Sequence, residues 1–266
     1  MGADIKALKT RIKSIDSTLQ ITSAMGLVAS SKLRQATSRM AKSSAYALCT
    51  EKIINMLSLC EECQNGIYMK KRDGRKCVVV IAGDRGLAGG YNSFVFKKLD
   101  AIENADIYPI GRRICDRVSK PFVSSEFFSS AEAYALADEL ADKYVSGEYT
   151  EIDIIGTKYV SALKQETYVK TLLPLSGKTE KMQGSAEFEP DAPTVMNSAV
   201  NEYLASAIFA SVKESFVCEL TERRAAMDNA DRNARQMLDE LHIQYNRARQ
   251  GAVTQEITEI TAGSGE

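Results

Sequence analysis

The placement of proline and glycine constrains this chain of 266 residues more than any other feature. All five prolines lie between Pro109 and Pro193. Gly26 is the only glycine between Ala3 and Asn65, and no glycine occurs between Ser185 and Gln250. Because these two residue types break helices most strongly, both ends of the chain are free to form very long helices.

Hydrophobic periodicity predicts that the N-terminal segment pairs with another helix. Its apolar residues recur at spacings of three and four, the a/d repeat of a coiled coil, at Ile5, Leu8, Ile12, Ile15 and Leu19. The same register then passes through mostly small residues, namely Thr22, Gly26, Ala29, Leu33, Ala36, Met40, Ser43, Ala47, Thr50, Ile54 and Leu57. Small residues let two helix backbones approach closely. We interpret Gly26 as a point of close contact; its cost of about 1 kcal/mol in helix propensity relative to Ala is tolerable in a helix that a partner stabilises.

The C-terminal segment has a matching repeat. Its members are Met227, Ala230, Ala234, Met237 and Leu241, followed by Tyr245, Ala248, Val253, Ile257 and Ile260. Residues 4–60 and 194–250 have the same length of 57 residues, roughly 85 Å as helices. If the block between them is compact, its two ends lie close together, which favours an antiparallel coiled coil. The alternative is that both helices fold back on the middle domain.

The middle of the chain has the pattern of an α/β domain. Strands are predicted at residues 76–82, 107–110, 149–155 and 167–173, and helices at 92–104, 112–118 and 131–146. This alternation predicts a small parallel, Rossmann-like sheet covered by helices. The expected organisation is an N-terminal coiled-coil helix at 1–62, a central α/β domain at 75–175 and a C-terminal coiled-coil helix at 194–266.

Composition excludes several classes of protein. The chain has 34 Lys and Arg against 35 Asp and Glu, so a polycationic nucleic-acid coat protein is not expected. No run approaches the ~18 apolar residues that span a bilayer, and the N-terminus has no apolar leader. Six irregularly spaced cysteines do not form a secreted disulfide framework, so reduced thiols are expected.

Three motifs are candidates for chemical sites. The turn from Gly83 to Gly90 follows a strand and precedes a helix, the setting of a phosphate-binding loop, but its glycine spacing does not match a nucleotide motif. Cys60 and Cys63 form a CxxC without a second ligand pair. His242 is the only histidine, so histidine clusters are impossible. We expect no catalytic site, metal or cofactor, and keep a nucleotide-binding α/β enzyme that uses the Gly83 turn as the alternative.

Charge is unevenly distributed along the chain. Residues 1–42 contain eight Lys and Arg against two Asp, a net charge of +6. Such a basic helix is explained by a solvated face, by a nucleic-acid footprint, or by a protein partner with acidic loops. The first 60 residues have only one aromatic side chain, Tyr46, which disfavours base stacking.

Several segments resemble the gamma subunit of F-type ATP synthases. The N-terminal match is ITSAMGLVASSKL at 21–33, the central match is the turn DRGLAGG at 84–90, and the C-terminal matches are RRAAMDNA at 223–230 and YNRARQGAVTQEITEI at 245–260. They occur at both ends and in the middle of the chain in the family's order. The resemblance therefore covers essentially the whole chain.

The resemblance implies a non-catalytic rotor. Its terminal helices would form an antiparallel coiled coil inside a ring of alpha and beta subunits, and the foot of the stalk would join the epsilon subunit and the membrane ring of c subunits. Nucleic acid is not an implied partner. The residues that would contact neighbouring subunits or govern coupling are Met25, Arg85, Arg223, Arg249, Gln250, Thr254 and Glu256.

The sequence departs from its relatives near Met25. They commonly carry Lys two residues before this Met and a charged residue after it, whereas this chain has Ser23 and Gly26. The cysteine-bearing insertion of the chloroplast form is also absent, so thiol switching is not expected. The missing transit segment predicts a bacterial subunit, peripheral at the cytoplasmic face of the cell membrane.

Overall fold

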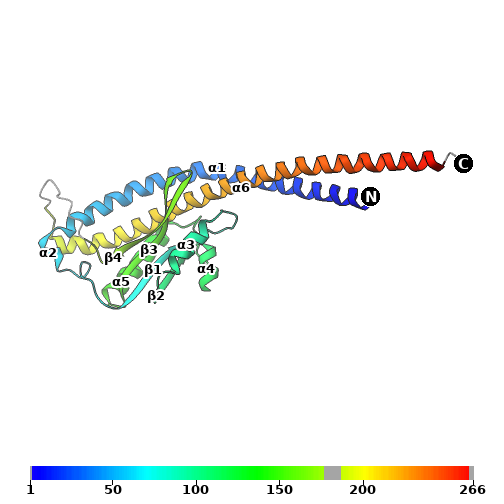
Figure 1. The fold of residues 1–266 in the computed structure, drawn as a ribbon. Coiled ribbons are helices and arrows are strands. Elements are labelled where there is room, and N and C mark those ends of the chain that lie inside the picture. The colour runs from blue at the N-terminus through cyan, green and yellow to red at the C-terminus, as the bar shows by residue number, and fades with distance from the viewer. Residues whose placement is uncertain (1, 177–186, 264–266) are drawn as a thin grey trace. The chain divides into compact units, whose positions relative to one another are not determined.

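The computed structural model describes residues 2–176 and 187–263. Its contacts divide the chain into two units, each built from segments that are distant in sequence. One consists of Met1–Ser30 with Arg223–Glu266 and is called the terminal helix pair; the other is Ser31–Glu222 and is called the sheet unit. The elements in chain order are α1 (Gly2–Ser58), α2 (Glu61–Gln64), β1 (Arg75–Ile81), α3 (Tyr91–Leu99), β2 (Ala105–Ile110), α4 (Arg112–Val118), α5 (Ser130–Val145), β3 (Tyr149–Ser161), β4 (Lys164–Leu173) and α6 (Ala192–Gly263) (Figure 1).

The sheet has the strand order β2-β1-β3-β4. β1 pairs in parallel with β2 and with β3, as the α/β alternation predicts. β4 instead pairs with β3 in antiparallel fashion, so the sheet is mixed. The reversal was not predicted because the connection between β3 and β4 contains Ala162 and Leu163 and has none of the Gly, Asn or Pro residues that mark a hairpin turn.

Alternate residues of the buried strand β1 serve two separate cores. Val79 and Ile81 pack in the larger core with α5 and α6, whereas Val78 and Val80 pack in the smaller one with α3 and α4. The period of two along a strand causes this division, and burial on both faces explains the continuous apolar run of β1. The sheet unit is therefore layered, with helices on both faces of the sheet.

The long helices contribute to this larger core. Ile54 and Leu57 of α1 and Val200, Leu204 and Ile208 of α6 are buried in it. Thr50 and Ser206 also join the two helices by a 2.6 Å hydrogen bond between their hydroxyl groups. Within the sheet unit, the two long helices therefore pair with each other and also pack on the α/β domain.

The terminal helix pair is antiparallel. The hydroxyl groups of Thr22 and Ser23 donate to the carboxylate of Asp231, and a Cβ on Gly26 would lie 3.5 Å from Cβ of Met227. In both facing pairs, Thr22 with Asp231 and Gly26 with Met227, the two residue numbers add to 253. A constant sum is the register of an antiparallel pair, so each α1 residue lies opposite the α6 residue that completes this sum. It places Ile5, Leu8, Ile12, Ile15 and Leu19 opposite Ala248, Tyr245, Leu241, Leu238 and Ala234, and all ten are buried or half-buried.

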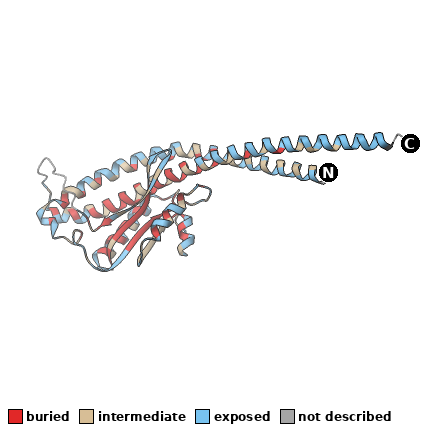
Figure 2. Cartoon of the chain, in the orientation of Figure 1, coloured by how far each residue is buried: buried red, intermediate tan, exposed pale blue. Residues whose placement is uncertain are grey.

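This register changes the predicted C-terminal seam in two ways: one seam residue is replaced by its neighbour, and the seam ends earlier than predicted. Met237 is 47% exposed, and Leu238 occupies the seam instead; because both residues are apolar, composition did not distinguish them. Gly2, the first described residue of α1, falls opposite residue 251. Residues 252–263 of α6 consequently have no described α1 residue opposite them, and Val253, Ile257 and Ile260 are exposed rather than paired. Figure 2 shows the C-terminal end of α6 in the colour of exposed residues.

We predict that Gly26→Ala stabilises the chain by up to about 1 kcal/mol, the difference in helix propensity. The added methyl group would make an ordinary van der Waals contact with Met227. Gly251→Ala is a matched control, because Gly251 lies in α6 and, apart from its own neighbouring residues and helix backbone, no atom lies within 4 Å of the position of its Cβ. Thermal unfolding measures both. A destabilised Gly26→Ala beside a stabilised Gly251→Ala would show that the helices approach more closely than this structure has them.

Candidate functional site

The exposed end of α6 gathers most of the predicted contact residues. Arg249, Gln250, Thr254 and Glu256 are all exposed there, and the Thr254 hydroxyl donates to the carbonyl of Gln250 at 2.9 Å. Helical spacing places Arg249 and Glu256 in line with Val253 and Ile260, and Gln250 and Thr254 in line with Ile257. These apolar side chains are largely exposed: Val253 by 46%, Ile257 by 58% and Ile260 by 66%. A stripe that mixes exposed apolar and charged groups is the composition expected of a protein interface.

Two further predicted contact residues lie deeper in the terminal helix pair. Met25 is half-buried beside Gly26. Arg223 is only 7% exposed and is packed within the chain. The structure therefore does not place these two on the surface formed by Arg249 and its neighbours.

The departure from relatives near Met25 has a structural consequence. The hydroxyl groups of Ser23 and Thr22 hold the pKa of Asp231 below its ordinary value, because their hydrogen bonds favour the ionised carboxylate. Beside Met25, hydrogen bonds from α1 hydroxyl groups to an α6 carboxylate therefore join the two helices.

The Gly83 turn is organised around a carboxylate of the protein itself. Asp84 accepts hydrogen bonds from the Ser124 hydroxyl at 2.6 Å and from the backbone N–H groups of Ser125, Glu126 and Arg112 at 3.0 to 3.1 Å. Burial acts to raise the pKa of Asp84, but the four hydrogen bonds outweigh burial and hold it below the ordinary value. One of these donors is the first N–H of α4, so the internal carboxylate already occupies the position where a helix N-terminus would bind an anion.

The rest of the turn is unsuited to phosphate. A Cβ on Gly83 would lie 2.8 Å from the Glu219 carboxyl group, and one on Gly89 would lie 2.9 Å from the Glu222 carboxyl group. Carboxylates therefore face the glycines that would have to approach a phosphate. This geometry argues against the nucleotide-binding alternative.

The outer side of the turn presents a charged and an apolar side chain. The Arg85 guanidinium lies 3.5 Å from the Glu126 carboxylate. The same carboxylate forms an ion pair with Lys32 of α1. Leu87 is exposed and adopts a positive φ of 61°. Glu126 was not identified from the sequence, since it lies in an irregular segment without a periodic pattern. Its role depends on the fold, which brings Lys32 and Arg85 to it from two distant parts of the chain.

The CxxC pair, Cys60 and Cys63, consists of free thiols. All six cysteines are free, and burial raises the pKa of Cys77 to about 12. Within residues 2–176 and 187–263, no group of three or more His, Cys, Asp or Glu side chains could hold a metal ion. No helix in these ranges is both long and apolar enough to cross a membrane.

Comparisons with known proteins extend over the whole chain. The family model described as ATP synthase matches residues 4–265. The ATP synthase gamma chain of Clostridium novyi is 36% identical and that of Clostridium kluyveri 37% identical, each over 279 aligned positions that cover 99% of this chain and 98% of the relative.

Solved structures share the fold. The rotor of Euglena gracilis mitochondrial ATP synthase matches with a TM-score of 0.67 at 18% identity, covering 95% of this chain and 100% of that one. A chain from the central stalk and c ring of the Tetrahymena thermophila mitochondrial enzyme matches with a TM-score of 0.58 at 20% identity, covering 79% and 99%. With full-length relatives well above 30% identity, this chain belongs to the ATP synthase gamma chain family.

Proposed function

We propose that this chain is the central-stalk rotor subunit of an F-type ATP synthase. By rotation it couples ion flow through the membrane c ring to ATP synthesis or hydrolysis on the ring of alpha and beta subunits. The observation that carries the proposal is the terminal helix pair of a chain in the gamma family. Beyond the described end of α1, α6 continues and exposes both apolar and charged side chains. The subunit itself is non-catalytic.

A single shaft without threefold symmetry cannot present the same surface to three equivalent neighbours. Each neighbour therefore has a different free energy and adopts a different conformation. Turning the shaft exchanges these states among the three neighbours, which is how rotation drives a catalytic cycle in other chains.

The partners in this proposal are the alpha and beta subunits, the epsilon subunit and the c ring. We propose as contact residues Met25 and Arg223 on the terminal helix pair, Arg249, Gln250, Thr254 and Glu256 near its end, and Arg85 on the Gly83 turn. Exposed ion pairs of roughly 0.2 to 1 kcal/mol suit a rotating contact, because no single angle is then held too strongly. We place the subunit at the cytoplasmic face of a bacterial membrane as a peripheral component.

Reconstitution tests the proposed function. The purified chain should assemble with alpha and beta subunits, and ATPase activity should appear in the mixture and not with the chain alone. Tight ATP binding or hydrolysis by the isolated chain would contradict the proposal and favour the enzyme alternative.

A cross-link tests the proposed contact surface. We expect a cysteine at Gln250 to form a disulfide with a cysteine on the facing beta subunit and to block turnover until it is reduced, because a covalent bond to the ring prevents rotation. The background should carry Cys49→Ser, since Cys49 is an exposed native thiol. ATPase activity is measured before and after reduction.

The matched control places a cysteine at Glu103, an exposed residue of the sheet unit outside both proposed contact surfaces. This variant should neither cross-link to the same beta cysteine nor lose activity. Full activity in the completely cross-linked Gln250→Cys complex would remove this surface from the rotating path.

A further inference from the structure

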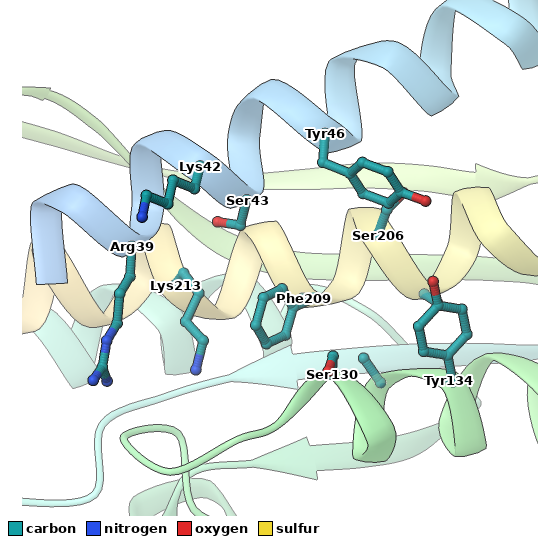
Figure 3. A pocket seen from close by; sticks show the side chains of 11 residues that line it. Arg39, Lys42, Ser43, Tyr46, Ser130, Tyr134, Ser206, Phe209 and Lys213 are labelled. Atoms are coloured by element: carbon teal, nitrogen blue, oxygen red, sulfur yellow. The ribbon is translucent and has the colours of Figure 1, made fainter.

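A hollow of about 380 Å³ lies between α1, α5 and α6 in the sheet unit (Figure 3). Its lining is almost entirely apolar. The hydroxyl groups of Tyr46 and Tyr134 both donate to Glu202 at 2.6 Å, and the ammonium of Lys213 donates to the Phe128 carbonyl. The polar groups around this hollow thus already serve internal packing, and reactive side chains have to be sought elsewhere in the sheet unit.

Cys60 and Cys63 lie one turn apart in the segment that joins α1 to β1. Cys60 has an extended backbone, with φ −71° and ψ 130°, and immediately precedes the four-residue helix α2. Cys63 is the third residue of α2, and its N–H donates to the Cys60 carbonyl at 3.0 Å. Residues three apart in a helical turn have Cβ atoms about 5 to 6 Å apart. Because a disulfide needs Cβ atoms roughly 3.5 to 4.5 Å apart, a shift of about 1 Å within this short turn brings the two thiols into bonding geometry.

The two thiols differ in burial. Cys63 is 3% exposed and belongs to the larger core, whereas Cys60 is half-buried and packs against that core from outside. The Cys60 thiol donates to the Met56 carbonyl at 3.7 Å, and a thiol is only a weak donor. Little energy therefore holds the Cys60 side chain in this orientation. The pair combines one thiol that a small reagent can reach with a second thiol that the core shields.

The surroundings of the pair disfavour a thiolate. Burial raises the pKa of the Cys63 thiol, and the charges of Cys60, Glu62 and Asp191 act in the same direction. A dithiol becomes a strong oxidant when its reduced form is stabilised, which usually means a stabilised thiolate. The reduced form of this pair gains no such stabilisation at Cys63, so exchange with a small disulfide favours the closed protein disulfide.

We propose that Cys60 and Cys63 form a modification site, a dithiol that a low-molecular-weight disulfide converts into an intramolecular disulfide. The Cys60 thiolate attacks one sulfur of the reagent, forms a mixed disulfide and releases the first small thiolate. The Cys63 thiolate then attacks the sulfur of Cys60, closes the protein disulfide and releases the second. Two protein thiols are oxidised and the reagent is reduced to two thiols, which take up the two protons that the protein loses.

This site is independent of the rotary function. It also differs from the cysteine-bearing insertion of the chloroplast form, because both cysteines lie in the segment between α1 and β1. The absence of that insertion therefore does not bear on the chemistry of this pair.

Equilibration of the purified full chain with glutathione and glutathione disulfide tests the proposal. After acid quenching and alkylation, trypsin releases residues 53–70 with both Cys60 and Cys63, and residues 43–52 with Cys49 alone. We expect the 53–70 peptide to lose two hydrogens. The equilibrium constant for its disulfide should be about tenfold or more above that of a synthetic 53–70 peptide, because the folded chain already holds the turn closed.

Cys49 is the matched control within the same sample. It is an exposed thiol of α1, and it should form a mixed disulfide with glutathione and go no further. A cysteine pair that stays reduced in the folded chain, at glutathione ratios that oxidise the synthetic peptide, would overturn the proposal. Equal equilibrium constants for the folded chain and the synthetic peptide would also overturn it.

Two variants test the order of the steps. In Cys63→Ala, Cys60 should stop at the mixed disulfide with glutathione, because the second thiol is missing. In Cys60→Ser, Cys63 should remain a free thiol, because it is buried. If Cys63 in Cys60→Ser reacted as fast as Cys60 in Cys63→Ala, the assigned order of attack would be wrong. The measurement on the wild-type chain stands without either variant.

Discussion

Replacing Asp84 by alanine is expected to destabilise the sheet unit by about 3 to 5 kcal/mol, because it leaves three half-buried donors without an acceptor and each costs at least about 1 kcal/mol. The variant removes the common acceptor of the Ser124 hydroxyl and three backbone N–H groups. These donors connect the segment after β1 with the N-terminus of α4 and with the segment after α4. Urea unfolding of the purified chain measures the loss.

Two controls separate this network from the general effect of losing a charge. Asp84→Asn keeps one oxygen acceptor at the position, so its loss should fall between those of the wild-type chain and Asp84→Ala. Asp100→Ala removes an exposed ion pair with Arg117 and should cost less than about 1 kcal/mol. If Asp84→Ala cost no more than Asp100→Ala, the hydrogen-bond network would not hold the turn.

Asp84 also predicts a dependence of stability on pH. Its folded pKa lies below the unfolded value of about 3.9. The carboxylate therefore contributes stability that is fully present above the unfolded pKa and is lost as the pH falls through the folded pKa. Asp84→Asn should show a shallower loss of stability below about pH 4 than the wild-type chain.

The second large effect is expected from Leu241→Asp. Leu241 is buried in the terminal helix pair opposite Ile12, and the substitution removes about 1.5 to 3 kcal/mol of apolar burial while placing a charge in the seam. The two helices should separate locally. Hydrogen exchange should then lose protection in α1 up to Ser30, and the assembled complex should synthesise less ATP, because a parted shaft transmits less torque.

Ile243→Asp is the matched control, since Ile243 is an exposed aliphatic residue two positions away on the same helix. It introduces the same charge without entering the seam and should leave exchange protection unchanged. Full ATP synthesis by a complex carrying Leu241→Asp, despite the lost protection, would show that the helix pair does not carry the torque at this level. Equal effects of both substitutions would show that charge, and not burial, matters.

Local sequence patterns predicted much of this protein because they depend on nearby residues. The missing prolines and glycines predicted two long helices, and the repeat from Ile5 to Leu19 identified the seam that the register confirms. The apolar run of β1 predicted a strand buried on both faces. Family motifs then pointed to the function, since they preserve particular side chains at both ends of the chain.

Tertiary structure decided between alternatives that the local sequence pattern does not distinguish. Met237 and Leu238 are both apolar, and only the register of the helix pair, which sets Leu238 opposite Ile15, selects Leu238. The antiparallel pairing of β4 depends on how the chain returns after Leu163, and the networks of Asp84 and Glu126 depend on segments separated by tens of residues. The sequence alone determined which stretches form helices and strands, because period and backbone preference are short-range properties. Only the fold decided which charges meet and which faces remain uncovered, because those outcomes require distant parts of the chain to come together.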